Sequence, residues 1–241
     1  MNPVLFRASK IAEIMGDALT IDPQYLTDEL STISRKTKKS DEEKAILAPL
    51  KMMSLSAGAK TAVECMAKEL VYGYTRTFSS KYTEKGLTVE DDSIALYNSV
   101  FFTNYAKNTE RRSNEWVTGE ADIVAPAKII DIKSSWSLDT FPAIAASGAD
   151  TTYEWQARVY MWLWEKPAAE IAYCLVNTPD ELIGYEPAEY HYVDEIPEIL
   201  RVTRVHYTRD LAAEERIKVK VEAARRYLAE LLQTIAAEHA A

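Results

Sequence analysis

Two short apolar segments that lie close together in the chain constrain its fold most. Residues 121–125 (ADIVA) and 128–132 (KIIDI) are each typical of a buried strand, and a proline separates them. Side chains two positions apart on a strand share one face, so Asp131 and Lys133 should project together. If the two strands pair as a hairpin, Asp122 can face the same point. Two carboxylates and an ammonium at a sheet edge are costly unless they bind a metal ion or a phosphate.

The composition is that of a soluble globular protein. The chain has 241 residues, of which 47% are hydrophobic and 27% are charged, and this is enough for one substantial domain. No segment approaches the roughly 18 consecutive apolar residues of a membrane span, and the N-terminus lacks the pattern of a secretory signal. These features predict a cytoplasmic protein with no membrane association.

Charge and cysteine content argue against several classes of function. The formal net charge of −9 argues against a protein that coats nucleic acid nonspecifically, although local basic patches can still bind it. Cys65 and Cys174 lie far apart in apolar contexts, which predicts reduced thiols in the core. Two cysteines are too few for a zinc or iron–sulfur site built on cysteine alone.

The order of the expected elements indicates three regions within a single domain, 1–241. These are a helical N-terminal region (1–80), a core (81–180), and a C-terminal strand and helix (181–241). We expect helices at 8–18, 41–74 (two helices), 89–101, 153–164 and about 211–237, and strands at 121–125, 128–132, 171–176 and 201–207. Together they predict an α/β fold of mixed type, with a central mixed sheet flanked by helices and a long C-terminal helix.

Local signals set the helix boundaries and one long loop. Ser9 is a candidate N-cap of the first helix, Gly86 indicates a turn, and Thr88 is a candidate cap of the helix that follows. The small, polar residues 134–152 predict a loop or flap.

Two further groups could join the central charges. Glu90 and the two aspartates after it fill the first turn of a helix, where the helix dipole accounts for them without any function. Gln156 and Tyr160 are four positions apart on a helix and therefore share one face. A solvated hairpin edge with incidental charges is the alternative interpretation of the whole set.

The segments GEADIV, IIDIK and QARVY together resemble the PD-(D/E)xK nuclease superfamily. Their pattern is similar to the branch with a downstream Q-x-x-x-Y motif, which includes phage lambda-type exonucleases and the nuclease domains of bacterial recombination helicases. The proline of the superfamily's name is absent, since Glu120 and Ala121 precede Asp122. The resemblance covers residues 90 to about 176 and implies a restriction-endonuclease-like core in which the elements follow the order α-β-β-β-α-β.

The resemblance also implies roles at the catalytic centre. The implied metal ligands are Glu90 (with Asp91 in reserve), Asp122, Asp131 and the backbone carbonyl of Ile132. The expected ions are Mg²⁺ or Mn²⁺, one or two per site, because hard carboxylate oxygens bind them. Lys133 would orient or activate the attacking water and offset charge on the scissile phosphate.

Further residues are implied in bracing the site and in binding DNA. Gln156 and Tyr160 would brace the site and contact the DNA strand. The candidate phosphate-binding residues are Arg7, Ser9, Ser134 and Arg158. The first two resemble the arginine and serine that bind the 5′-phosphate in lambda-type enzymes, although their spacing is shorter.

The resemblance implies a metal-dependent exonuclease that hydrolyses phosphodiester bonds of double-stranded DNA with a free end. It would digest from 5′ to 3′ in the cytoplasm of a bacterial or phage-infected cell and produce single-stranded DNA for phage-type recombination. A homo-oligomer is implied, in the lambda-type relatives a trimeric ring, with a single-strand annealing protein as a partner. No iron–sulfur cluster is expected, because the relatives that carry one use four cysteines.

Two alternatives remain at this point. One is an endonuclease of the same superfamily that acts in restriction or repair. The other is a noncatalytic DNA-binding subunit, which is disfavoured because all the motif residues are present: Asp122, Asp131, Lys133, Gln156 and Tyr160.

Overall fold

The computed structural model describes residues 3–74 and 80–240, which fall into two compact units. The first unit comprises Met1–Arg76 and Leu211–Ala241, and the second comprises Thr77–Asp210. Within the described residues, no helix is both long enough and apolar enough to cross a membrane. The prediction of a single domain stays a prediction.

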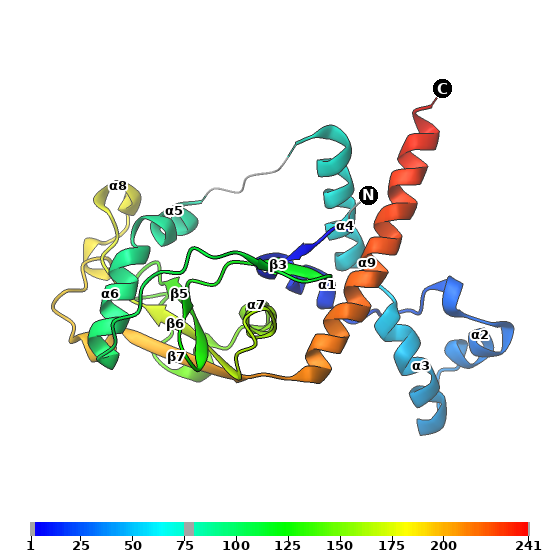
Figure 1. The fold of residues 1–241 in the computed structure, drawn as a ribbon, viewed down its shortest axis with the longest axis horizontal. Helices are drawn as coiled ribbons and strands as arrows, with labels where there is room; N and C mark the ends of the chain where they lie inside the picture. Colours follow the sequence, from blue (N-terminus) through cyan, green and yellow to red (C-terminus); the bar gives the residue numbers. More distant parts are fainter. Residues whose placement is uncertain (1–2, 75–79, 241) are drawn as a thin grey trace. The chain divides into compact units, whose positions relative to one another are not determined.

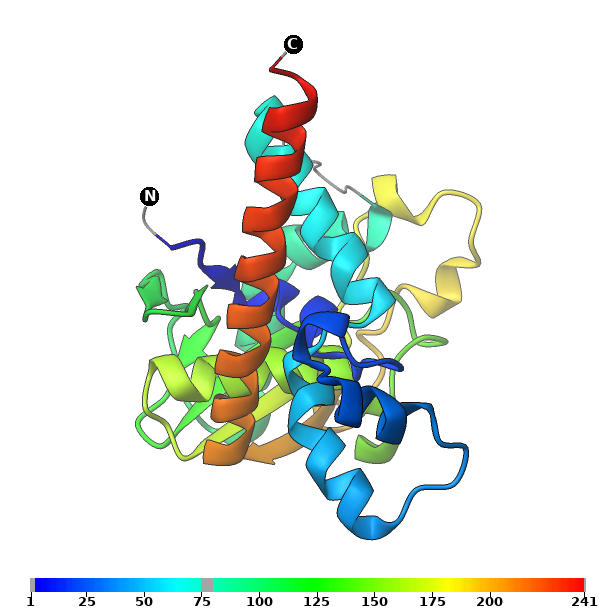
Figure 2. The same ribbon diagram turned by 90° about the vertical axis from the view of Figure 1, so that its right-hand side faces the viewer.

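The first unit is helical. Its elements are β1 (Phe6–Arg7), α1 (Ala12–Met15), α2 (Asp28–Arg35), α3 (Asp41–Met53), α4 (Ala57–Tyr72) and α9 (Leu211–Glu238). The long helix α9 packs along α1, α3 and α4 (Figures 1 and 2). α4 buries Val63, α9 buries Ile217 and Val221, and the two helices contact one another, so these apolar side chains are removed from water.

The second unit is built on a four-stranded mixed sheet. Its strands follow the order β4 (Ile123–Val124), β5 (Lys128–Ser134), β6 (Ala168–Cys174) and β7 (Val202–Thr208). β4 and β5 are antiparallel, β5 and β6 are parallel, and β6 and β7 are antiparallel. The parallel pair needs a crossover, which α7 (Thr151–Leu163) provides. A short hairpin, β2 (Arg112–Ser113) with β3 (Val117–Gly119), precedes the sheet.

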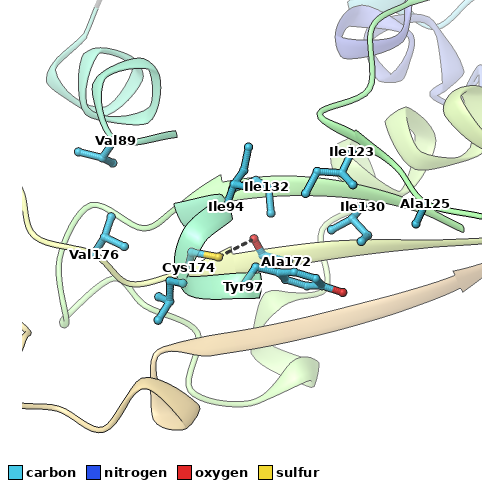
Figure 3. Packing of buried hydrophobic residues seen from close by; sticks show 11 residues of the cluster. Val89, Ile94, Tyr97, Ile123, Ala125, Ile130, Ile132, Ala172, Cys174 and Val176 are labelled. Carbon is cyan, nitrogen blue, oxygen red and sulfur yellow. Dashed lines mark hydrogen bonds between the residues drawn. The ribbon is translucent and has the colours of Figure 1, made fainter. Parts of the chain in front are cut away.

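The alternation of β5 sends successive side chains to helices on opposite faces of the sheet. Ile130 and Ile132 pack with α6 (Glu90–Phe101) in a buried cluster that Figure 3 shows. Asp131 and Lys133 instead form hydrogen bonds with Gln156 of α7. The apolar residues thus hold the sheet to one helix, while the charged ones face the other.

A buried lysine fixes the ends of the two central strands. Lys85 lies on α5 (Lys81–Thr88) and has no exposed surface. Its ammonium donates to the carbonyl oxygens of Ser135 (2.7 Å), Trp136 (2.9 Å) and Val176 (2.9 Å). Burial lowers the pKa of Lys85 to about 8. These bonds tie the chain just beyond β5 and β6 to the helix that precedes α6.

The predicted α/β class, the mixed sheet and the long C-terminal helix are confirmed. The observed order is α6, β2, β3, β4, β5, α7 and β6, which has one short strand more than the α-β-β-β-α-β order that the resemblance implies. The remaining helix, α8 (Asp180–Ile183), lies in the connection between β6 and β7.

Three local predictions were wrong. Gly86 lies inside α5 rather than in a turn, because Ser80 and Thr83 form a reciprocal cap that starts this helix earlier. The Thr88 hydroxyl donates back to Glu84 O (2.9 Å) and does not cap α6. Ser9 lies within a 3-10 turn, Ala8–Lys10, and α1 follows without a side-chain cap.

The predicted burial of the two cysteines holds for only one of them. Cys174 is buried in β6, where burial raises the pKa of its thiol to about 12. Cys65 is exposed, because it lies on α4 two positions after Val63, on a different side of the helix from the buried residue.

Candidate active site

The hairpin register brings the two aspartates together. Ile123 pairs with Ile130, so the next pair outward would place Asp122 opposite Asp131. At this point the Asp122 Oδ2 atom accepts a hydrogen bond from the Ile132 backbone N–H (2.7 Å). The side chain of Asp122 therefore takes over where the backbone ladder ends, and it turns toward β5.

Asp131 is held from two sides. Its side chain is buried, and Lys133 Nζ lies 2.7 Å from its Oδ2 atom as an ion pair. Gln156 of α7 donates from Nε2 to Asp131 Oδ1 (3.3 Å) and to the Tyr160 hydroxyl (3.0 Å). The Gln156 Oε1 atom accepts from Lys133 Nζ (3.4 Å). The i, i+4 pair on α7 thus connects to both charged residues of β5.

The electrostatics of the site show a shortage of positive charge. Burial raises the pKa of Asp122 to about 7, and the nearby Asp131 charge adds to this effect. Burial opposes the charge on Lys133, but the charges on Asp131 and Asp122 outweigh it and raise the pKa of Lys133 above its usual value. Burial also raises the pKa of Tyr160, which therefore stays neutral. One ammonium serves two desolvated carboxylates.

Glu90 reaches the site's edge but pairs with a lysine. The Glu90 Oε2 atom lies 2.5 Å from Lys107 Nζ. The charge on Glu90 also contributes, as the smallest of the causes, to the raised pKa of Asp122. Asn108 fixes the position of Lys107, because its backbone and side-chain N–H groups donate to Asp122 O (2.7 Å) and Ala121 O (2.9 Å).

The donor set fits a divalent cation of the Mg²⁺ type. Asp122 and Asp131 offer hard oxygen atoms that are desolvated and short of positive charge, which is the environment that such a cation compensates. Among residues 3–74 and 80–240, no three or more histidine, cysteine or acidic side chains are already gathered closely enough to hold a metal. The ion-paired Glu90 would have to leave Lys107 to become a third carboxylate ligand.

The predicted phosphate-binding residues lie in different surroundings. Arg7 and Ser9 are both exposed, in the helical unit. The Ser134 hydroxyl lies 2.8 Å from that of the buried Ser93, which joins β5 to α6. Arg158 donates to Glu154 one turn earlier on α7, with its Nε atom at 3.0 Å. DNA contacts by these residues stay predictions.

Two residues at the site were missed at the sequence level. Lys107 gave no local signal, since it lies in a loop and meets Glu90 only through the fold. Tyr153 lies on α7, and the face of its ring is 4.4 Å from Lys133 Nζ. Its position three residues before Gln156, on the same helix face, was the signal that could have identified it.

Comparison with solved structures identifies relatives of the whole chain. A phage-related exonuclease from Haemophilus somnus 129PT is 32% identical, with 97% of each chain covered and a TM-score of 0.78. The chain belongs to the phage-related exonucleases. No family model matches this exonuclease, and a search of curated proteins finds no match.

More distant structures share the fold of the exonuclease. The alkaline exonuclease LHK-Exo from Laribacter hongkongensis is 12% identical, with 98% and 93% of the two chains covered and a TM-score of 0.56. A second LHK-Exo structure, in complex with dAMP, is 13% identical with the same coverage and a TM-score of 0.60. The predicted phage-type exonuclease branch, and with it an enzyme that hydrolyses phosphodiester bonds of DNA, is confirmed.

Proposed function

We propose that the exonuclease uses a divalent cation to hydrolyse linear double-stranded DNA, at a site centred on Asp122, Asp131 and Lys133. The observation that carries this proposal is the pair of desolvated aspartates that share a single ammonium at the end of β5. A site that already needs positive charge is stabilised by a cation and by the phosphate that the cation binds.

The metal would be held by the two aspartates and the backbone carbonyl of Ile132, with Glu90 as a further ligand. Mg²⁺ or Mn²⁺, one or two per site, matches these hard oxygen donors. Such an ion, when bound, supplies a Lewis acid that lowers the pKa of water and offsets charge on the scissile phosphate.

The protein's own residues orient and neutralise. Lys133 is protonated at neutral pH, since the nearby aspartates raise its pKa, so it acts as a fixed positive charge and hydrogen-bond donor to a phosphate oxygen. Gln156 keeps both Asp131 and Lys133 in place through its two ends. Tyr160 holds the amide of Gln156 and is itself buried, which suits bracing better than direct contact with DNA.

The direction of digestion and the partners follow from the resemblance to lambda-type enzymes. Digestion from a 5′ end would yield single-stranded DNA for a single-strand annealing protein. Arg7 and Ser9 are the candidates for the 5′-phosphate, and their exposure is compatible with this role. A homo-oligomer, such as a ring of three chains, would enclose the duplex and keep the enzyme on it.

Digestion of linear duplexes with 5′-phosphate, 5′-hydroxyl or blocked ends tests this function directly. Each is incubated with Mg²⁺, with Mn²⁺ or with EDTA, beside closed circular duplex. We expect metal-dependent nucleotide release from the linear 5′-phosphate substrate, none with EDTA, and an intact circle. Equal activity of wild type and Asp131→Ala, or no activity of wild type with any of the metals, contradicts the assignment of the site.

A further inference from the structure

The ammonium of Lys133 is contacted by three groups of different chemistry. Asp131 Oδ2 lies at 2.7 Å and Gln156 Oε1 at 3.4 Å, and the centroid of the Tyr153 ring lies at 4.4 Å. The first two are hydrogen-bond acceptors or charges, whereas the third is an aromatic face. The side chain of Lys133 keeps only 22% of its exposure, so these contacts replace most of its water.

The position of Tyr153 is itself well determined by the fold. It lies in the first turn of α7, which Asp150 caps by accepting from Thr152 N (2.6 Å) and Tyr153 N (3.2 Å). Tyr153, Gln156 and Tyr160 are at positions i, i+3 and i+7, so one face of the helix carries all three.

A second tyrosine supports the ring from the sheet. Tyr173 of β6 meets Tyr153 edge to face, with ring centroids 6.2 Å apart. The Tyr173 hydroxyl donates to Gly148 O (2.7 Å), at the end of the 134–152 loop. A Cβ atom at Gly148 would lie 2.8 Å from the Tyr173 ring, so the backbone of Gly148 packs directly against this ring.

An aromatic face does something for Lys133 that another acceptor would not. It attracts a cation through the ring quadrupole, most strongly where water is excluded. It offers no lone pair and no formal charge. It therefore restrains the ammonium and leaves the N–H groups of Lys133 available to donate hydrogen bonds to a phosphate oxygen. A third carboxylate in the same place would neutralise the lysine.

We propose that Tyr153 is a positioning residue that holds the Lys133 ammonium, through the face of its ring, in the orientation needed at the scissile phosphate. This inference rests on the proposed role of Lys133 in hydrolysis. It extends the bracing face of α7 by one residue, to Tyr153, Gln156 and Tyr160. The positioning depends on the negative face of the Tyr153 ring and does not require the Tyr153 hydroxyl.

A series of ring substitutions separates these contributions. Tyr153 is replaced by phenylalanine, by 3,5-difluoro- and 3,4,5-trifluorophenylalanine, and by leucine, and kcat and KM are measured on linear duplex DNA with Mg²⁺. We expect Tyr153→Phe to keep kcat within about twofold and Tyr153→Leu to lose about tenfold, with fluorination giving a graded loss between them. KM should change by less than about threefold, because the ring orients the lysine and does not itself bind DNA.

The matched control is Tyr82, another tyrosine with a lysine over its ring. Lys81 Nζ lies 5.4 Å from the Tyr82 ring centroid. This pair lies on α5, whereas Tyr153 lies on α7, and it is distant in the sequence from Asp122 and Asp131. The same fluorinated series at Tyr82 should leave kcat unchanged. In a Lys133→Met background, fluorination at position 153 should add no further loss, since the charge that the ring attracts is gone.

The outcomes divide clearly. A Phe variant as defective as the Leu variant, or a fluorinated series without any trend while Lys133→Met lowers kcat, overturns the inference about Tyr153 and leaves the proposed function standing. A wild-type enzyme without metal-dependent hydrolysis overturns the proposed function and this inference with it. Because the fluorinated rings are nearly isosteric, the trend remains measurable even if the Leu variant does not fold.

Discussion

Two buried carboxylates, Asp131 and Glu170, lie on neighbouring strands and on opposite faces of the central sheet, and they differ in how fully their negative charge is compensated. Asp131 of β5 pairs in register with Ile171 of β6. Glu170 directly precedes Ile171, so its side chain lies on the opposite face of the sheet from Asp131. Asp131 shares its single ammonium with Asp122. Glu170 accepts from the Tyr97 hydroxyl (2.7 Å) and Lys128 (2.5 Å), and Arg204 lies at 3.5 Å.

The difference shows in the pKa values. Burial alone would raise the pKa of Glu170, but the hydrogen bonds from Lys128 and Tyr97 outweigh it and hold the pKa below its usual range. At Asp122 burial and Asp131 act together and raise the pKa to about 7. A fully compensated acid stabilises the fold, whereas an under-compensated pair is ready for a cation that the chain itself does not supply.

The largest effect is expected on activity from Asp131→Asn. Asparagine keeps the shape and the acceptor for Gln156 but removes the charge, so kcat should fall by about 10³-fold or more. The unfolding midpoint should stay the same or rise, because the repulsion with Asp122 is removed. Nucleotide release and urea unfolding on the same preparation check both parts, and a variant that loses stability and not activity contradicts the contrast.

The reverse pattern is expected for Glu170→Gln. This change leaves Lys128 and Arg204 without their carboxylate, and the free energy of unfolding should drop by about 2–3 kcal/mol. Activity per folded molecule should remain within about threefold at a temperature where the variant is folded. Urea denaturation gives the first quantity and single-turnover digestion the second; a large loss of kcat in folded Glu170→Gln would place this cluster in the catalytic machinery.

Asp122 should make the metal-free protein less stable as pH rises. Its pKa in the folded state is raised to about 7, whereas in the unfolded state it is near the ordinary aspartate value. The folded state therefore binds the proton more tightly, and its contribution to stability is lost as pH rises through the folded pKa. Between pH 5 and pH 7.5 wild type should lose about 2 kcal/mol relative to Asp122→Asn in EDTA.

Adding Mg²⁺ should abolish most of that difference, because the cation favours the ionised carboxylate. Parallel urea titrations of the two proteins across this pH range, with EDTA and with Mg²⁺, provide the measurement. Identical pH profiles in EDTA would show that Asp122 is not desolvated.

The smallest effect is expected at Lys107. Its ion pair with Glu90 is partly exposed, with 45% of the lysine side chain accessible, so it is weak. Lys107→Met frees Glu90 and should tighten Mn²⁺ binding by about two- to fivefold in calorimetric titrations of metal-free protein. Lys44→Met, which removes an exposed pair with Asp41 on α3, is the control and should leave Mn²⁺ affinity unchanged.

Much of the sheet and its site could be predicted because the relevant signals are local. The alternation in KIIDIK fixes which side chains share a face, and the short connection after Val124 makes an antiparallel neighbour the simplest arrangement. The i, i+4 spacing of Gln156 and Tyr160 likewise needs only the helix. The family pattern then gave these residues a chemical meaning.

Other parts could not be predicted because they depend on contacts that distant segments make. Glu90 pairs with Lys107, which lies 17 positions away in a loop whose next residue, Asn108, bonds to the backbone of Asp122. The start of α5 at Lys81 depends on a cap in which Thr83 replaces the more usual glutamate, and Gly86 then read as a break. A tyrosine on an apolar helix is typical of core packing, so the sequence alone does not assign Tyr153 to the site.

The buried ammonium of Lys85 has a practical consequence. Burial lowers its pKa to about 8 and also keeps any reagent from reaching it, whereas opening of the chain around its three carbonyl partners exposes it as an ordinary lysine amine. Its rate of modification by an amine-specific label therefore measures how often the chain beyond β5 and β6 opens locally. This rate can be measured without DNA or metal and again with them, and a slower rate would show that this end of the sheet opens less often.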